Sequence, residues 1–215
     1  MLMTYTLGEL KGRILTALGL DTRNGLALPA SHGVRADLNG RMLQEIDMMC
    51  RKISAASRAL SNTAVFDFSF AEPMAGRRLL PLPDDFIAVL HCTDAGGTAY
   101  SAYSIAGASL SVPSDFGGTL TLTYVCAHPE ISADTADTAP MSFDRSLCDA
   151  VICGVAANLS LSAEAYDFNR FIRLQTEYDE RMTEIYKRAC RHAPARRTLY
   201  DAARCRDIPL KGRWS

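Results

Sequence analysis

Apolar residues recur at helical spacing through the first sixty residues. Thr6 and Glu9 form a capping-box pattern, in which each side chain accepts the other's backbone N–H, so a helix is predicted to start at Leu7. Gly19 predicts the end of this helix. After a loop, a second helix is expected from about residue 34 to residue 60. One stripe of it is predicted to be buried, made of Leu38, Met42, Ile46, Met49, Ile53 and Leu60.

The pattern changes to strand spacing after residue 64. Phe66, Phe68 and Phe70 alternate with polar residues, which predicts a strand with one buried face. The prolines of residues 80–83 predict an extended, non-helical segment. Further strands are expected at 86–92, 100–105, 110–112 and 119–128, and residues 94–97 are expected to form a hairpin turn. These elements predict a small, mostly antiparallel β unit.

Helical spacing returns after residue 140. Ser142 is expected to cap a helix whose apolar residues, from Phe143 to Leu159, lie four apart. Small residues such as Gly154 lie between them and permit close packing, so this helix is predicted to be the central one of the core. A long last helix is predicted to run from after Ser162 to about residue 191.

Together these elements predict an α+β fold: a four-helix core with a small antiparallel β insertion and an extended C-terminal tail. The helical core domain is expected to comprise residues 1–61 and 141–192. Residues 62–130 form the β-rich insertion, residues 131–140 a polar linker, and residues 193–215 a basic extended C-terminal arm.

Charge is distributed unevenly along the 215 residues. Hydrophobic residues make up 48% and charged residues 22%, which is ordinary for a globular protein and excludes wholesale disorder. The formal net charge is −1, but residues 187–215 hold nine basic and two acidic residues, which gives +7 there and −8 in the rest. A tail and a body of opposite sign predict that the tail meets an acidic surface on a partner, a neighbouring copy or nucleic acid.

We expect neither an export signal nor a membrane span. The first ten residues have no basic start and reach Glu9 before an apolar run builds. Residues 95–114 are uncharged but rich in Gly, Ser and Ala, which does not fit a membrane span. Seven cysteines, an odd number without the spacing of a disulfide framework, favour a reduced cytosolic environment.

The common catalytic motifs are absent from the sequence. It has no glycine-rich nucleotide loop, no G-x-S-x-G and no H-E-x-x-H, so a protein that is not an enzyme is expected. His91, Cys92, Cys126 and His128 are the best metal candidates, and a metal-dependent enzyme is an alternative. Their spacing differs from that of zinc knuckles, so buried core residues and no cofactor are favoured. Asp84-Asp85 is interpreted as a turn rather than a magnesium site.

The basic arm is the remaining functional candidate. It combines arginines with aromatic residues, types enriched at binding hot spots, in a segment too short to fold alone. The residues expected to bind a partner are Arg196, Arg197, Tyr200, Arg204, Arg206, Leu210, Arg213 and Trp214. Docking on a protein is favoured because the arginines are dispersed among apolar and small residues. A nucleic-acid-binding regulatory protein that uses this arm is the alternative, since the same residues suit phosphates and bases.

Several segments, taken in order, carry a resemblance to a known family. They are Thr6-Leu7-Gly8-Glu9-Leu10, Leu82-Pro83-Asp84-Asp85-Phe86, Leu120-Thr121-Leu122-Thr123-Tyr124, His128-Pro129, the acidic linker, Phe143-Asp144 through Gly154-Val155-Ala156-Ala157, and the Tyr-rich helix from Tyr178 to Tyr186. Over about residues 4–190 this order resembles the head-to-tail adaptor (connector or head-completion) proteins of tailed bacteriophages.

The resemblance implies a structural protein of the virion. Such a protein forms a homo-oligomeric ring, a dodecamer, that joins the portal protein to tail or neck proteins and lets genomic DNA pass through its channel. It implies assembly in the host cytoplasm, a final place at the head–tail interface, no membrane partner, and a C-terminal arm that reaches the portal or a neighbouring copy. The arm residues named above match no family motif and are inferred from composition.

Overall fold

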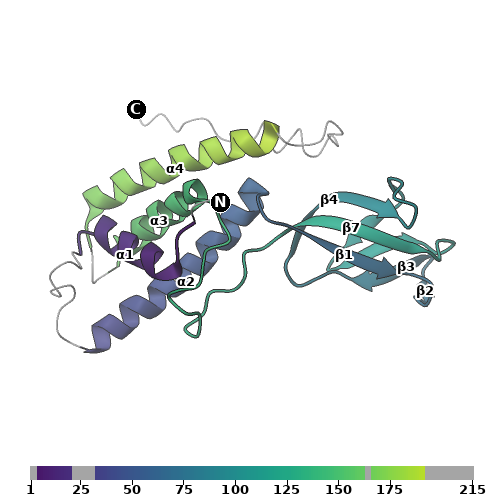
Figure 1. Cartoon of the computed structure of the whole chain (residues 1–215), viewed down its shortest axis with the longest axis horizontal. Helices are drawn as coiled ribbons and strands as arrows, with labels where there is room; N and C mark the ends of the chain where they lie inside the picture. Colours follow the sequence, from purple (N-terminus) through teal and green to yellow (C-terminus); the bar gives the residue numbers. More distant parts are fainter. Residues whose placement is uncertain (1–3, 21–31, 163–165, 192–215) are drawn as a thin grey trace.

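The computed structural model describes residues 4–20, 32–162 and 166–191, and Figure 1 shows an elongated molecule with helices at one end and strands at the other. In this part of the chain the elements are α1 (Leu7–Ala17), α2 (His32–Ser57), β1 (Ser61–Asp67), β2 (Pro73–Met74), β3 (Arg77–Pro81), β4 (Phe86–Asp94), β5 (Ser104–Ala106), β6 (Ser109–Pro113), β7 (Thr119–Cys126), α3 (Arg145–Leu159) and α4 (Phe168–Arg191).

Local interactions of the backbone set where α1 begins and where α2 ends. The capping box predicted for α1 is confirmed: Thr6 Oγ1 accepts the Glu9 N–H at 3.2 Å, and Glu9 Oε2 accepts the Thr6 N–H at 2.9 Å. Helix α2 ends at Ser57 because Arg58 takes a left-handed φ of 53°, three residues before the predicted end. Leu60 lies beyond the helix but still packs against the helical core.

Helix α3 is the central helix, as the sequence predicts. Eleven of its fifteen residues are buried, and α1, α2 and α4 each pack against it. Its N-cap is Asp144, whose Oδ1 accepts the Leu147 N–H at 2.9 Å; the expectation that Ser142 caps this helix is wrong. Instead, the exposed Ser142 lies before the buried Phe143, which enters the core ahead of the first turn.

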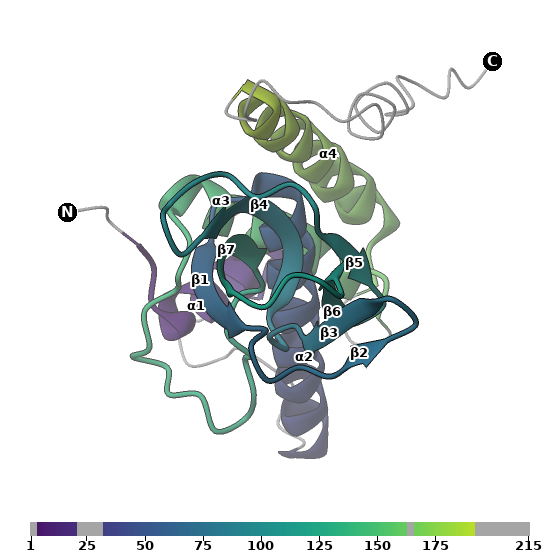
Figure 2. The same ribbon diagram turned by 90° about the vertical axis from the view of Figure 1, so that its right-hand side faces the viewer.

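The strands form two antiparallel sheets with a core of their own. Strand order is β1-β7-β4 in one sheet and β2-β3-β6-β5 in the other. Figure 2, viewed from the β end, shows the two sheets on opposite sides of a shared interior. That interior is filled by Phe66, Phe68, Cys92, Leu110, Val112, Leu120, Leu122 and Tyr124. The β unit therefore has its own hydrophobic stabilisation.

The expectation of a four-helix core with a small antiparallel β insertion is wrong, although the chain is α+β. Among the described residues, seven strands in two sheets form a second unit, and the helices are arranged around α3 rather than as a four-helix core. Strands β5 and β6 of the second sheet lie near the predicted strands at 100–105 and 110–112, but β2 and β3 escape prediction because they do not alternate apolar with polar residues. Strand β3 holds two arginines and a proline beside Leu79 and Leu80. The predicted C-terminal tail lies outside the described residues.

Residues 131–140 lie along the start of α1. Ile131 is buried, and its N–H donates to Asp47 Oδ1 at 3.0 Å. The Leu7 N–H donates to the Ala139 carbonyl at 2.9 Å, and Lys11 forms an ion pair with Asp137 at 2.7 Å. These bonds tie the segment to the helices although most of its side chains are exposed.

Gly154 and Gly40 make a matched pair for testing the packing of α3. A Cβ at Gly154 would lie 2.6 Å from the Met49 methyl and 3.0 Å from the Tyr178 ring, whereas one at Gly40 on α2 would meet nothing within 4 Å. We expect Gly154→Val to lower the free energy of unfolding by about 3 kcal/mol through overpacking. Gly40→Ala should raise it by about 0.5–1 kcal/mol through helix propensity. Urea unfolding followed by circular dichroism measures both; equal effects would contradict this account.

Candidate functional site

The four metal candidates do not come together. His91 is exposed on β4 opposite Thr123, while Cys92 is buried next to it in the sheet interior. Cys126 pairs with Phe86 at the other end of β4. Within residues 4–20, 32–162 and 166–191, no group of three or more His, Cys, Asp or Glu side chains is placed to hold a metal ion.

His128 joins the β unit to the helices. Its N–H donates to Ser54 Oγ of α2 at 3.0 Å, and its ring lies 5.0 Å from that of Phe143. Nδ1 lies 2.7 Å from the Pro129 carbonyl, and Nε2 accepts the Ser142 N–H at 3.3 Å, which assigns the proton to Nδ1. Burial lowers the pKa of His128 below its usual value, so the ring is neutral, and both ring nitrogens are used in structural hydrogen bonds.

The adjacent side chains of Asp84 and Asp85 lie in different surroundings. Asp84 is exposed, whereas Asp85 Oδ1 accepts the Tyr124 hydroxyl at 2.9 Å. Burial first, and this hydrogen bond second, raise the pKa of Tyr124 to about 12, so the phenol stays protonated as the donor. The Phe86 N–H donates to the Pro83 carbonyl at 3.0 Å, so the segment turns into β4 as the sequence predicts.

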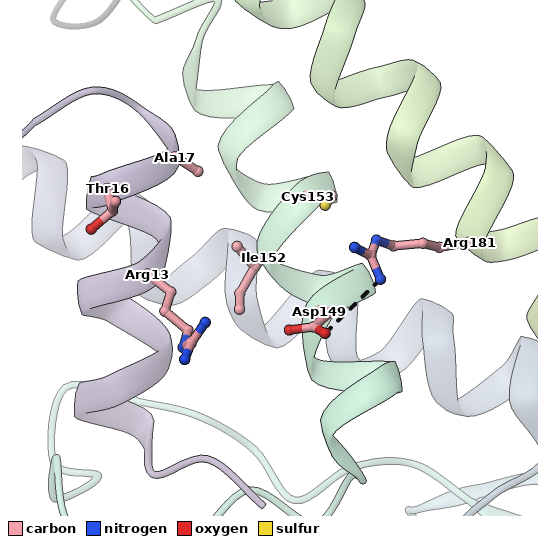
Figure 3. Close-up of a pocket in the computed structure, with 7 residues that line it drawn as sticks. All are labelled: Arg13, Thr16, Ala17, Asp149, Ile152, Cys153 and Arg181. Carbon is pink, nitrogen blue, oxygen red and sulfur yellow. Dashed lines mark ion pairs between the residues drawn. The ribbon is translucent and has the colours of Figure 1, made fainter.

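The described residues show an open groove of about 610 Å³ between α1, α3 and α4 (Figure 3). Helix α3 supplies its floor, where Ile152 and Cys153 are both buried. Arg13 of α1 and Arg181 of α4 lie on opposite sides of Asp149. We name this feature the three-helix groove; its lining residues are Arg13, Thr16, Ala17, Asp149, Ile152, Cys153 and Arg181.

Guanidinium groups dominate the rim of the three-helix groove. The Tyr5 ring has the guanidinium carbon of Arg13 at 4.5 Å from its centroid and that of Arg145 at 4.9 Å. The Tyr5 hydroxyl accepts Arg145 Nε–H at 2.8 Å and donates to Asp149 Oδ1 at 3.2 Å. Arg181 Nη1 lies 4.0 Å from Asp149 Oδ2. The groove therefore presents cationic groups around an apolar floor, an arrangement suited to binding an acidic, partly apolar segment.

The Cys153 thiol at the floor of the groove is not activated. Its Sγ donates to Glu177 Oε2 at 3.7 Å. Burial raises the pKa of Cys153, and this outweighs the nearby Arg181 charge, so the thiol stays protonated at neutral pH.

A second surface lies at the far end of the β unit, around β2 (Figure 1). Phe70 is 90% exposed there, so the expectation that it shares a buried face with Phe66 and Phe68 is wrong. Strand β1 ends at Asp67, whose Oδ1 accepts the Ser69 N–H at 2.9 Å, and the chain turns before Phe70. Met74 is 67% exposed. We name residues 70–74 the β tip.

Sequence reasoning found neither surface. The groove residues come from three helices, more than 160 residues apart between Arg13 and Arg181, and no local spacing links them. For the β tip a local signal exists: Asp67 followed by Ser69 favours a turn, which would have separated Phe70 from the strand. The predicted arm residues Arg196, Arg197, Tyr200, Arg204, Arg206, Leu210, Arg213 and Trp214 lie outside the described residues.

No family model and no curated protein matches this chain. The likeness to phage adaptors therefore has no support from sequence relatives. None of the helices in the described part of the chain is long and apolar enough to cross a membrane.

The neutral state of His128 predicts a specific pH dependence. The unfolded chain takes up a proton at its usual pKa of about 6.5, while the folded ring, with its lowered pKa, does not. Stability should therefore fall as the pH drops from 7.5 through 6.5, until the folded pKa is passed. We expect His128→Gln to be less stable at pH 7.5 but to lose part of this slope. His91→Gln, on an exposed position, should keep it. Thermal unfolding between pH 7.5 and 5.5 measures this, and equal slopes for parent and His128→Gln would contradict the assignment.

Proposed function

We propose that the chain is a structural protein of a bacteriophage virion, a head-to-tail adaptor whose copies form a ring between portal and tail. The observation that carries the proposal is the pair of unlike surfaces on one elongated molecule. The apolar β tip lies at the end away from the helices, and the three-helix groove lies among them. Two different surfaces on one subunit are what heterologous, head-to-tail association requires, and such association gives rings when it closes.

The chemistry of the candidate sites supports a binding role rather than catalysis. The groove is open and lined by arginines, its cysteine is protonated, and His128 and Asp85 are used in structural hydrogen bonds. The ring would be a dodecamer with genomic DNA in its channel. The arm, residues 193–215, would dock on the portal protein through its arginines and aromatic residues. Tail or neck proteins would bind the opposite face of the ring.

The experiment that tests this function is a measurement of particle mass and symmetry. The purified chain is examined by light scattering and electron microscopy, alone and mixed with the portal protein of the same virus. We expect a closed ring, or a ring that forms on the portal. A chain that stays monomeric at high concentration and ignores the portal would overturn the proposal. Tight binding to duplex DNA by a small oligomer, with a steep dependence on salt, would instead favour a nucleic-acid-binding regulator.

Removal of residues 194–215 tests the role of the arm. All eleven described elements, α1 to α4 and β1 to β7, end before residue 194, so the shortened chain should fold and keep its thermal stability. We expect it to lose portal binding in a co-sedimentation assay and to fail in completing particles. Unchanged portal binding and particle completion would show that the arm is not the docking segment.

A further inference from the structure

The β tip is an apolar surface with one acidic group. Phe70 is 90% exposed and Met74 is 67% exposed, and Glu72 lies exposed between them. Among the described residues, Glu72 has no ion pair. Exposed phenylalanine and methionine side chains on one short segment are of the types that become buried in interfaces.

The turns on either side hold the β tip in place. Arg78 Nη1 donates to the Phe68 carbonyl at 2.7 Å, and Arg78 Nε donates to the Ser114 carbonyl at 3.0 Å. After β2, Ala75 and Gly76 have φ values of 51° and 76°, the left-handed pair of a tight two-residue hairpin turn. A surface held in place before binding loses less conformational entropy when it docks.

The three-helix groove is complementary to this tip. Among its lining residues the cations are Arg13 and Arg181 and the one carboxylate is Asp149, so one positive charge is in excess in the lining. Within the described part of the chain, Arg13 has no ion pair and contacts the Tyr5 ring. Its guanidinium is exposed beside the apolar floor formed by Ile152.

We propose that the β tip of one copy docks in the three-helix groove of the next copy, with Phe70 on the apolar floor and the Glu72 carboxylate beside Arg13. The inference rests on the proposed function in one respect, that copies of the chain assemble with one another. The β tip lies at the end of the molecule away from the helices, so it does not meet the groove of its own copy, and the contact is between copies (Figure 1). A tip-to-groove contact is heterologous and repeats around a ring.

This contact is small. A stable dimer typically buries about 1,200–2,000 Å² in total, more than a five-residue tip supplies. We therefore expect it to set the register between neighbours and to act together with other contacts of the ring, so that its loss weakens assembly in a concentration-dependent way.

The test is a charge reversal with rescue. Glu72→Arg places an arginine against Arg13, and Arg13→Glu places a glutamate against Glu72; each should weaken self-association at least about 10-fold. The chain that carries both substitutions restores an opposite pair at every contact and should return to within about 3-fold of the parent. An equimolar mixture of the two single variants should also assemble, because each tip then meets a groove of opposite charge. Analytical ultracentrifugation over a concentration series measures all four.

A second pair of variants tests the apolar part. Phe70→Ser should weaken association at least about 10-fold, whereas Val65→Ser should leave it unchanged, since Val65 is also exposed (68%) but lies on β1 outside the tip. Both side chains are on the surface of the β unit, so neither change should lower the thermal midpoint. Circular dichroism checks this for every variant, including Arg13→Glu, which loses the contact with Tyr5.

The outcomes separate the two proposals. If the parent forms rings and no tip or groove variant alters them, the contact is wrong and the adaptor function stands. If tip variants lose binding to portal or tail proteins while self-association is unchanged, the tip serves another protein and the contact is again wrong. If the parent never assembles, alone or with the portal, the adaptor function fails and the contact fails with it.

Discussion

The helical part of the chain depends on how closely three helices can approach α3. Ala150, Ala156 and Ala157 are fully buried, and Gly154 leaves room for the Met49 methyl and the Tyr178 ring. Small side chains on a buried helix let neighbouring helices pack at short distance, which raises the number of dispersion contacts per residue. The same helix supplies the floor of the three-helix groove. The groove therefore has its shape because α3 is packed on its other sides.

The orientation of the β unit depends on a few buried hydrogen bonds rather than on a shared core. The hydrophobic residues of the helices and of the sheets form separate clusters. Between them, the His128 N–H donates to Ser54 Oγ and the Ser142 N–H donates to His128 Nε2. Next to them along the chain, the Ile131 N–H donates to Asp47 Oδ1. A buried donor or acceptor that loses its partner costs about 1–3 kcal/mol, so these bonds disfavour other orientations. In the proposed ring, the angle between the two contact surfaces of a subunit would set how many copies fit, and this joint would fix that angle.

The sequence predicts those parts of the fold that depend on neighbouring residues. The Thr6–Glu9 capping box and the α3 stripe are local patterns, and the structure confirms them. Two strands of the second sheet, β5 and β6, lie near the predicted strands at 100–105 and 110–112. Strands β2 and β3 of this sheet were missed because they are short and do not alternate apolar with polar residues, and β3 pairs with a distant partner; Leu80 in β3, for example, pairs with Leu110 in β6. The groove is a similar case, since Arg13 and Arg181 are brought together only by packing on α3.

The small sizes of the β tip and of the three-helix groove fit reversible assembly of many copies better than permanent pairing of two copies. A protein with a large exposed apolar face would aggregate before it met its partners, whereas a tip of two apolar side chains and one carboxylate stays soluble. In the proposed assembly, each contact of this size would be weak by itself, so a single pair of copies would separate easily and wrong pairings would be corrected. When a ring closes, the last copy is held by two neighbours at once, and the second contact forms at a high effective concentration. Weak, directional contacts thus favour the closed ring over open chains of copies.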